Sequence, residues 1–428
     1  MSIRVGIAGL GTVGGGVVKL LLEHAALQSE RAGQSIGIAA VSALEMPDEL
    51  SPLLAGAVWH GDALEMARSP DVDVVVELIG GEEGVARKVV ETALGAGKSV
   101  VTANKALIAH HGNELARMAE KNSASLLFEA AVAGGIPILK SMREGLAANR
   151  LDSVYGILNG TCNYILTEME QTGRGFSEVL IEAQSLGYAE ANPETDIDGI
   201  DSAHKLTILA SVAFGCSASF GAVFVDGIRN ISALDIEFAR ELGYRIKLLG
   251  IARRGEHGVE HRVHPCMVSI DTPIARVSGV LNAVVVEGDY VGRTVFEGAG
   301  AGERPTASAV VGDLIDLARG HGAPPFAVPV GKLVVQPVVS MDARVGAYYV
   351  RLIVRDQPGV LAEAARVFAE EGVSIESVLQ RGRDPGSTVP LILTTHDTEE
   401  VAMMRVRDRL ANLTAVVEDP ALIRIESL

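Results

Sequence analysis

The sequence predicts an α/β protein of three domains. Its 428 residues suffice for about three units of roughly 150 residues each. In the N-terminal part, continuous apolar runs of strand length alternate with amphipathic segments of helix length. The C-terminal part repeats such elements in the order βαββαβ. The predicted fold is therefore an N-terminal doubly wound parallel sheet, an α+β middle domain and a C-terminal ferredoxin-like βαββαβ unit.

The N-terminal part contains five predicted strands, each a run of mostly apolar residues: 2–8, 36–41, 72–79, 98–103 and 125–128. Helices are expected between them, at residues 13–24, 82–96 and 106–121. Continuously apolar strands that are separated by helices indicate a parallel sheet with both faces covered.

The middle part differs, because its helices and strands are grouped and do not alternate. Helices are expected within residues 164–186 and 203–214, and short β-like runs follow at 247–252 and 284–288. This grouping is typical of an α+β domain. Residues 320–339 contain four of the sixteen prolines and are predicted to form an extended connector.

The C-terminal part is expected to form a compact unit of its own. Its predicted strands are 348–355, 374–380, 389–395 and 422–426, and its predicted helices are 359–371 and 399–413. The expected domains are residues 1–133 (with a return segment near 303–340), 134–320 and 346–428.

Charge and composition exclude several classes of protein. Acidic residues outnumber basic ones by 54 to 37, for a net charge of −17, so the basic footprint of a nucleic-acid partner is missing. No apolar run reaches the ~18 residues of a membrane span, so no membrane partner is expected. The cysteines Cys162, Cys216 and Cys266 form no CxxC pair. They predict no disulfide framework and favour a reducing compartment, the cytoplasm.

The first strand is followed by a GxGxxG motif formed by Gly9, Gly11, Thr12, Val13 and Gly14. The first glycine permits a tight turn, the second lets a pyrophosphate approach the backbone, and the third lets helix pack on strand. The motif predicts a Rossmann-like domain that binds NAD or NADP, with a ligand-free glycine loop as the alternative. Residues 41–45 (VSALE) place neither an acid nor an arginine at the end of the second strand. The choice between the two cofactors therefore stays open.

Several charged residues are candidates for chemistry: Lys105, Glu129, Glu190, Asp196, Asp201 and Lys205. Asp201 and Lys205 are four residues apart in an apolar helix, so they share one face. A lysine buried beside a carboxylate can move a proton, whereas an exposed pair is an ordinary surface ion pair. The residues alone leave both readings open. Lys105 follows a parallel strand at the edge where ligands bind, and a solvated loop lysine is its alternative.

Five longer segments carry a family resemblance: VTANK (101–105), FEAAVAGGIPIL (128–139), GILNGTCNYIL (156–166), LGYAEANPETDIDGIDSAHKL (186–206) and GAGAGERPTASAVVGDL (298–314). In this order and spacing, the chain resembles homoserine dehydrogenase over essentially its whole length. The resemblance implies an NAD(P)-dependent oxidoreductase that interconverts L-aspartate 4-semialdehyde and L-homoserine. Such an enzyme serves threonine, methionine and isoleucine biosynthesis.

The resemblance also implies roles for particular residues. Lys205 is expected to be the proton donor and acceptor, and Lys105 a second catalytic residue near the nicotinamide. The implied substrate-binding residues are Glu190, Asp201, Asp196, Tyr188, Gly160 and Thr161. The implied cofactor-binding residues, besides the glycine motif and Lys105, are Thr102, Gly187 and Gly302.

A monovalent cation, sodium or potassium, is implied in the same way. Its ligands would be the side chain of Glu129 and the backbone carbonyls of Val132, Gly134 and Ile136. Without the resemblance, a structural turn with an incidental glutamate is the favoured reading. Cys162 stands where the family often has threonine, and it is interpreted as a small buried residue and not as a catalytic thiol. Five histidines are considered for metal binding and are interpreted as loop residues: His110, His111, His257, His261 and His264.

The C-terminal unit resembles an ACT domain, because the segment DQPGVL (356–361) follows a strand and opens a helix. The resemblance implies allosteric feedback control by threonine, with Asp356 and Gln380 as candidate contacts. A dimerisation module without a ligand is the alternative, and a homodimer or homotetramer is expected. Two rival functions are a dehydrogenase of another amino acid or aldehyde, and a non-catalytic amino-acid sensor. Glu190 with Asp201 suits a substrate ammonium group and disfavours the first, and the intact lysines disfavour the second.

Overall fold

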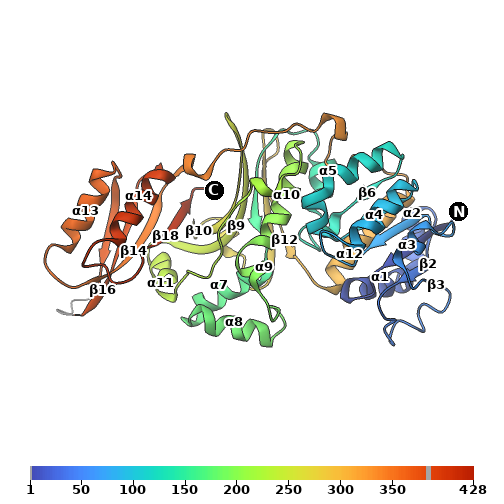
Figure 1. Ribbon diagram of the computed structural model, residues 1–428, viewed down its shortest axis with the longest axis horizontal. Helices are drawn as coiled ribbons and strands as arrows, with labels where there is room; N and C mark the ends of the chain where they lie inside the picture. Colours follow the sequence, from blue (N-terminus) through green and yellow to red (C-terminus); the bar gives the residue numbers. More distant parts are fainter. Residues whose placement is uncertain (1, 382–386) are drawn as a thin grey trace.

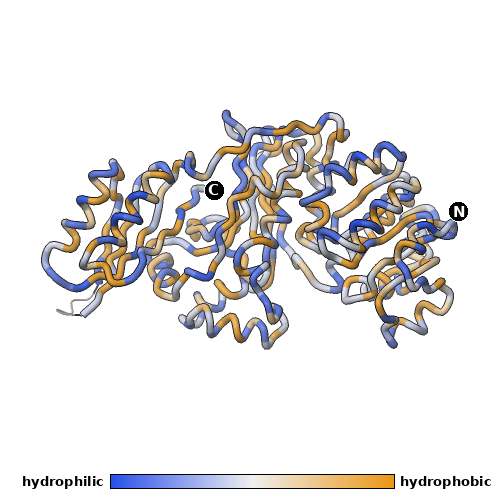
Figure 2. Tube along the Cα trace, in the orientation of Figure 1, coloured by the Kyte–Doolittle hydropathy of each residue, from blue (hydrophilic) through white to orange (hydrophobic). Residues whose placement is uncertain are grey.

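A computed structural model describes residues 2–381 and 387–428. The molecule is elongated, with the N-terminal α/β unit at one end, a large sheet in the middle and the C-terminal unit at the other end (Figure 1). Hydrophobic segments run along the strands of all three parts, whereas hydrophilic segments gather on the outer turns and helix faces (Figure 2). The predicted fold class is confirmed. No helix in the described part of the chain is both long and apolar enough to span a membrane.

The N-terminal sheet is wholly parallel and has the strand order β3-β2-β1-β4-β5-β6. Its strands are β1 (Ser2–Ala8), β2 (Ser35–Ser42), β3 (Val58–Trp59), β4 (Val74–Glu77), β5 (Ser99–Thr102) and β6 (Leu126–Leu127). The chain order reverses between β1 and β4, and in doubly wound sheets the crevice at such a reversal binds ligands at the carboxyl ends of the strands.

The helices of this unit are α1 (Thr12–Glu23), α2 (Ala25–Ala32), α3 (Ala63–Arg68), α4 (Val85–Gly95) and α5 (Lys105–Lys121). From far along the chain, α12 (Glu303–Ala318) returns and packs on α1. The contact is close, because a Cβ at Gly16 would lie 2.9 Å from the backbone oxygen of Glu303. The short elements α2, α3 and β3 were not expected from the sequence, since each is too brief to show a clear period.

The middle sheet and the C-terminal sheet form one ten-stranded sheet, whose main path is β12-β11-β7-β9-β10-β18-β14-β16-β15. The middle part contributes β7 (Leu151–Ile157), β9 (Tyr244–Gly255), β10 (Gly258–Ser269), β11 (Leu281–Gly288) and β12 (Gly292–Ala299), with the short β8 (Phe224–Val225) beside β10. Its helices are α6 (Ile138–Lys140), α7 (Gly160–Thr172), α8 (Phe176–Ser185), α9 (Glu194–Ile197), α10 (Ile200–Phe214) and α11 (Ala233–Glu241). The expected helical stretch 164–186 is two helices, because Gly173 ends α7 in a left-handed conformation (φ 72°).

The C-terminal unit has the predicted βαββαβ order. It consists of β14 (Tyr348–Arg355), α13 (Val360–Glu370), β15 (Ile375–Gln380), β16 (Thr388–Thr395), α14 (Glu400–Ala411) and β18 (Ala421–Glu426), with a small separate ladder of β13 (Val345–Gly346) and β17 (Thr398–Glu399). Its last strand, β18, pairs in parallel with β10. One edge of the small domain is therefore already paired with the middle domain.

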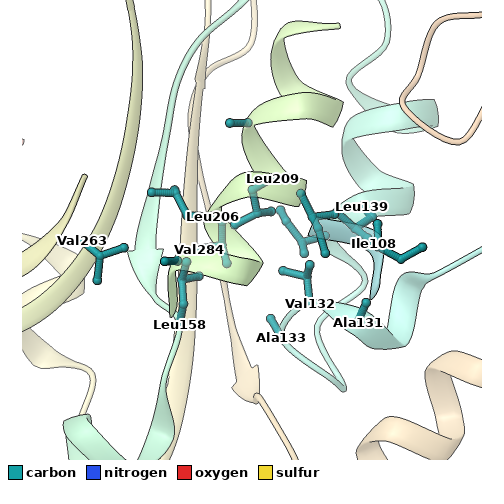
Figure 3. Close-up of a cluster of buried hydrophobic side chains, with 14 of the residues drawn as sticks. Ile108, Ala131, Val132, Ala133, Leu139, Leu158, Leu206, Leu209, Val263 and Val284 are labelled. Atoms are coloured by element: carbon teal, nitrogen blue, oxygen red, sulfur yellow. The ribbon is translucent and has the colours of Figure 1, made fainter. Parts of the chain in front are cut away.

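Helix α10 lies near the middle of the molecule (Figure 1), between the middle sheet and the segment that leaves the N-terminal unit (Figure 3). Leu206 and Leu209 point to opposite neighbours: Leu206 lies near Leu158 and Val284, and Leu209 lies toward Leu139. All five side chains are buried. The helix is therefore held on both sides, and the polar residues at its start are placed rigidly.

The connector 320–339 is mostly irregular, as predicted. Its first half packs on the N-terminal unit, where the Val330 N–H donates to Glu120 Oε1 of α5 at 2.7 Å. Its second half lies against the middle part, where Val334 and Val338 bridge to Cys216 and Val259. One expectation is corrected by these elements. The loop interpretation of the histidines is wrong for His110 and His111, which lie on α5, and for His261 and His264, which lie within β10. His261 and His264 interrupt the apolar pattern of β10, so the sequence pattern did not predict this strand.

Candidate functional site

A cavity of about 440 Å³ lies where the start of α5 meets the starts of α7 and α10. It collects most of the residues that the sequence suggested for substrate and cofactor: Lys105, Gly160, Thr161, Gly187, Tyr188, Glu190, Asp196, Asp201, Lys205 and Gly302. They come from five separate segments of the chain and become neighbours only in the folded protein. Thr102, the glycine motif and the Glu129 turn do not line this cavity.

Asp201 is the centre of the charged cluster. Its two carboxylate oxygens contact different lysines, Oδ1 at 2.9 Å from Lys105 Nζ and Oδ2 at 2.7 Å from Lys205 Nζ. Burial would raise the pKa of Asp201, but the two ammonium groups outweigh it and hold this pKa well below its usual value. The Asp201 charge in turn raises the pKa of Lys105 against the effect of burial. Lys105 therefore carries a proton at neutral pH.

Lys205 is the more buried of the two lysines, with 10% of its side chain exposed against 40% for Lys105. Its Nζ donates to Asp201 Oδ2 and to the carbonyl oxygen of Leu158, each at 2.7 Å. An ammonium group has three N–H donors, so one is left for a ligand in the cavity. The alternative of an ordinary surface ion pair is thereby excluded for Asp201 and Lys205, because both side chains are buried.

Asn159 was not foreseen as a site residue. Its side-chain oxygen accepts from the backbone N–H of Cys162 and caps α7, while its Nδ2 donates to Asp196 Oδ1 (2.7 Å) and Asp201 Oδ2 (2.8 Å). It therefore holds the two carboxylates in place. Asparagine is a preferred N-cap residue, so its cap of α7 has a local signal, whereas its contacts with Asp196 and Asp201 have none.

The rim of the cavity is formed by Thr161, Tyr188 and Glu190. The Thr161 hydroxyl donates to the carbonyl oxygen of Tyr188 at 2.6 Å, and the Tyr188 ring packs on Tyr164 with centroids 4.8 Å apart. Glu190 is exposed at the edge. Burial and the neighbouring Asp201 raise the pKa of Asp196. The rim and Asp196 thus add two carboxylates and two hydroxyl groups to the lysine cluster.

The thiol of Cys162 fits the interpretation of a small buried residue. It is fully buried at the start of α7, and its Sγ donates to the carbonyl oxygen of Asp196 at 3.2 Å. Burial and the nearby carboxylates raise its pKa well above the usual range, so the nucleophilic thiolate is disfavoured.

The glycine motif adopts the geometry of a dinucleotide loop. Gly9 has φ 100°, and a Cβ at Gly14 would lie 2.1 Å from the carbonyl oxygen of Gly9, so helix and strand meet there closely. A Cβ at Gly11 would meet nothing within 4 Å. Gly11 precedes α1 without a side-chain cap, so the first N–H groups of this helix are free to bind an anion. The loop therefore fits a pyrophosphate, the group that NAD and NADP share.

The other predicted cofactor contacts differ from the expectation in one respect. The Thr102 side chain is buried and donates to Glu77 Oε2 at 2.5 Å, so it supports the loop after β4 and does not face the cavity. Gly187 (φ 76°) and Gly302 (φ 116°) lie at the cavity wall. At the end of β2, Ser42 is buried and Glu45 is exposed, which leaves the cofactor choice open.

The carboxylate of Glu129 does not fit a cation ligand. Its oxygens accept from the backbone N–H groups of Leu139 (2.9 Å) and Lys140 (2.7 Å), and Arg143 lies 3.5 Å away. Burial outweighs these partners and raises its pKa. The carbonyls of Val132, Gly134 and Ile136 belong to the adjoining turn, where Gly134 is left-handed (φ 43°). Of the predicted cation ligands, the three backbone carbonyls of this turn are therefore left, without the Glu129 carboxylate.

A second predicted site lies in the C-terminal unit. A cavity of about 370 Å³ is lined by Asp356, Gln380 and the start of α13. Gly359 precedes α13 with φ 97° and no side-chain cap. The two candidate residues from the sequence therefore lie at one cavity.

Three family models match the chain in succession. "Homoserine dehydrogenase, NAD binding domain" matches residues 9–129, "Homoserine dehydrogenase" matches 137–315, and "ACT domain" matches 348–412. These three ranges follow the order of the three structural units.

Known proteins resemble the chain over its full length. Homoserine dehydrogenases of Pseudomonas aeruginosa and Neisseria gonorrhoeae are 47% and 45% identical, each covering 100% of this chain and 99% of the relative. A crystal structure of a homoserine dehydrogenase from Thiobacillus denitrificans superposes with a TM-score of 0.93 at 46% identity, covering 100% of this chain and 98% of that one. A hyperthermophilic archaeal homoserine dehydrogenase in complex with NADPH matches 74% of this chain and 97% of its own, with a TM-score of 0.63 at 28% identity.

Proposed function

The chain belongs to the homoserine dehydrogenase family, and we propose that Lys205 donates the proton that converts L-aspartate 4-semialdehyde to L-homoserine. The observation that carries this proposal is the Lys205 ammonium group, which is buried, fixed by Asp201 and the Leu158 carbonyl, and left with one free N–H. An ammonium group so placed both stabilises and protonates a developing alkoxide.

The remaining charged residues support that step. When bound, the nicotinamide of NAD(P) supplies the hydride to the aldehyde carbon. As negative charge grows on the aldehyde oxygen, Lys205 Nζ gives its proton to that oxygen. Asp201 keeps Lys205 oriented, and Lys105, 2.9 Å from the same carboxylate, adds a second positive charge beside the reacting oxygen. In the reverse direction, Lys205 accepts the proton of the homoserine hydroxyl.

The amino-acid end of the substrate is a zwitterion and needs both signs of charge. We assign its ammonium group to the carboxylates of Glu190 and Asp196, with Tyr188 beside them at the rim. Its carboxylate is assigned to the start of α7 at Gly160 and Thr161, because free N–H groups at a helix N-terminus bind anions. A Cβ at Gly160 would lie 2.7 Å from the Val280 carbonyl oxygen, so only glycine permits this close wall.

The test replaces Lys205 in two ways. Lys205→Ala is expected to lower kcat by about 10²–10⁴-fold with little change in KM, as for loss of a general acid. Lys205→Arg keeps the charge but holds its proton too firmly to transfer it, so it should be nearly as slow. Lys121→Ala, an exposed change at the end of α5, is the control. Near-normal turnover in Lys205→Arg would refute proton donation by this residue.

The cofactor can be NAD or NADP, and we propose that this chain discriminates weakly between them. Support comes from the end of β2, where neither an acid for the ribose hydroxyls nor an arginine for the 2′-phosphate occurs. A preference beyond about a hundredfold in kcat/KM, roughly 2.7 kcal/mol, would contradict this proposal.

We propose further that a sodium or potassium ion binds through the backbone carbonyls of Val132, Gly134 and Ile136. The Glu129 carboxylate is engaged by backbone N–H groups, so Glu129→Gln should leave any dependence of activity on sodium or potassium unchanged. Loss of that dependence in Glu129→Gln would instead show that the Glu129 carboxylate is a ligand of the ion.

Threonine is proposed as the effector of the ACT domain, at the cavity of Asp356 and Gln380. A zwitterion fits a site that combines a carboxylate, an amide and an uncapped helix start. Inhibition by threonine that is weakened in Gln380→Ala, with turnover in its absence unchanged, is the expected result. A cytoplasmic homodimer or homotetramer is also proposed. The three free, buried cysteines suit a reducing compartment, and sedimentation measures the assembly.

A further inference from the structure

Three potential metal ligands converge beside α10, outside the lining of the substrate cavity. Glu82 follows β4, His110 lies on α5 and His204 lies on α10 directly before Lys205. The His110 Nε2 atom is 3.0 Å from Glu82 Oε2 and 3.3 Å from His204 Nε2. One ligand atom from each residue lies within 4.8 Å of the other two. None of the three lines the substrate cavity.

These separations match the spacing of ligands around a tetrahedral metal. A zinc ion holds imidazole nitrogens at about 2.0–2.1 Å, which places two of them roughly 3.3 Å apart at a tetrahedral angle. Two histidines with one carboxylate form a known type of three-ligand zinc site that leaves a fourth position open. The side chains of His110 and Glu82 are 28% and 49% exposed, so an ion can enter from solvent.

No arrangement of protons on two neutral histidines gives every polar atom of this cluster a hydrogen bond. If His204 donates through Nε2 to His110 Nε2, the latter has no proton left for the Glu82 carboxylate. If His110 donates instead, the proton of a neutral His204 is on Nδ1, which is buried and has no hydrogen-bond partner among the described residues. A single cation would accept all three lone pairs at once.

The three ligands are held in place by the elements that carry them. Gly80 and Gly81 are left-handed (φ 86° and 85°) and turn the chain after β4, and Asn104 Nδ2 fixes this loop by donating to the Gly81 carbonyl oxygen at 2.6 Å. The Phe220 ring packs on both imidazoles, with each pair of centroids 4.6 Å apart. The site is therefore built before an ion arrives.

We propose that Glu82, His110 and His204 form a binding site for a divalent transition-metal ion of the zinc class. Occupancy would join the loop after β4 and α5, which belong to the nucleotide-binding domain, to α10 of the catalytic domain. The two helices that present Lys105 and Lys205 would then be tied at a second point besides the contact of Lys105 with Asp201.

A second cluster of potential metal ligands, His264, Cys266 and Glu426, is not proposed as a metal site. Glu426 there is already paired with Arg262 at 3.1 Å and with Arg344 at 3.0 Å. Two guanidinium groups repel a cation. Within the described part of the chain, the ion pair of Glu82 is with His110, and no lysine or arginine contacts its carboxylate.

The experiment titrates Co²⁺ into the untagged, chelator-treated protein and follows visible absorption, since tetrahedral cobalt absorbs strongly and hydrated cobalt weakly. One Co²⁺ per chain is expected, displaced by Zn²⁺. His110→Ala and Glu82→Gln should each weaken binding at least about tenfold, because even outer partners of a metal typically cost about 10–100-fold in affinity.

The matched controls are the adjacent residues His111→Ala and Glu83→Gln, which form an ion pair of their own at 2.8 Å. They should bind Co²⁺ as the unaltered chain does. Zn²⁺ should also raise the thermal unfolding midpoint of the unaltered chain and of His111→Ala, but not of His110→Ala. Absent tetrahedral absorption, or equal binding by His110→Ala and His111→Ala, overturns the proposal.

Discussion

At the residue scale, Asp201 decides how the two lysines behave. It is buried with one ammonium group on each carboxylate oxygen, so two positively charged side chains share one negative charge. The spacing of Asp201 and Lys205 is readable from the sequence, because residues four apart in a helix share a face. Asn159 was missed because its side chain contacts residues far along the chain, which no local pattern records.

Replacement of Asp201 by asparagine should move the pH profile of the reaction. The Asp201 charge is the main cause that raises the Lys105 pKa, so its removal lowers that pKa. Lys105 then loses its proton at a lower pH, and the alkaline limb of kcat/KM for aldehyde reduction should shift to lower pH. A drop in kcat of about 10²-fold or more is expected as Lys205 loses its orientation.

Asp201→Glu is the companion variant, since it restores the charge at a slightly different position. It should bring the alkaline limb back toward that of the unaltered chain even where kcat stays low. A limb that stays unmoved in Asp201→Asn would show that Lys105 does not govern it.

At the element scale, helix starts organise both ends of the active region. The glycine loop before α1 fits a pyrophosphate, and α5, α7 and α10 begin at the proposed substrate cavity. The sequence predicted the main strands and helices here, because the apolar periods are clear and the glycine motif marks the first turn. It did not predict β10, where His261, Arg262 and His264 are buried through tertiary contacts. It also did not predict that the Thr102 hydroxyl donates to Glu77 and so does not face the cavity.

The glycine motif allows a prediction that separates folding from cofactor binding. Gly14→Ala places a Cβ 2.1 Å from the Gly9 carbonyl oxygen, and such overpacking typically costs about 1–3 kcal/mol. Gly11→Ala meets nothing within 4 Å, so the free energy of unfolding should hardly change. Its added methyl group instead enters the space for the pyrophosphate and should raise the KM for NAD(P).

Urea unfolding and cofactor kinetics on the two variants provide the measurement. The expected pattern is a lower midpoint for Gly14→Ala, and for Gly11→Ala an unchanged midpoint with a KM raised several-fold. A normal cofactor KM in Gly11→Ala would mean that the phosphates do not approach this glycine.

At the scale of the whole molecule, the catalytic and ACT domains share one sheet. The parallel pairing of β10 with β18 joins them, and a buried cluster of charged side chains lies across that joint. Glu426 accepts from Arg262 of β10 and from Arg344 before β14. The βαββαβ order was predictable because its periods are local. The joint was not, since parallel pairing between distant strands leaves no mark in either segment.

The joint can be weakened at Glu426. Burial alone would raise its pKa, but Arg262 and Arg344 lower it to about 2. The ionised side chain therefore adds stability that is fully present above its unfolded pKa of about 4.3 and is lost as pH falls toward 2. Glu426→Gln removes the buried carboxylate that Arg262 and Arg344 share and leaves them only Glu260 and, at 3.9 Å, Glu400. The change should cost up to roughly 3–5 kcal/mol. The variant should also lose much of the acid dependence of its unfolding midpoint.

Glu418→Gln provides the control, because this carboxylate is 64% exposed and lies 3.7 Å from Arg351, so the change should cost about 0–1 kcal/mol. Limited proteolysis tests where the loss acts. If the shared sheet holds the domains together, Glu426→Gln should release a C-terminal fragment faster than Glu418→Gln does, with turnover in the absence of threonine retained. Any inhibition by threonine should weaken in parallel, since the ACT domain then acts through a loosened joint. Unchanged cleavage in Glu426→Gln would mean that strand pairing alone, without the buried ion pairs, holds the ACT domain to the catalytic sheet.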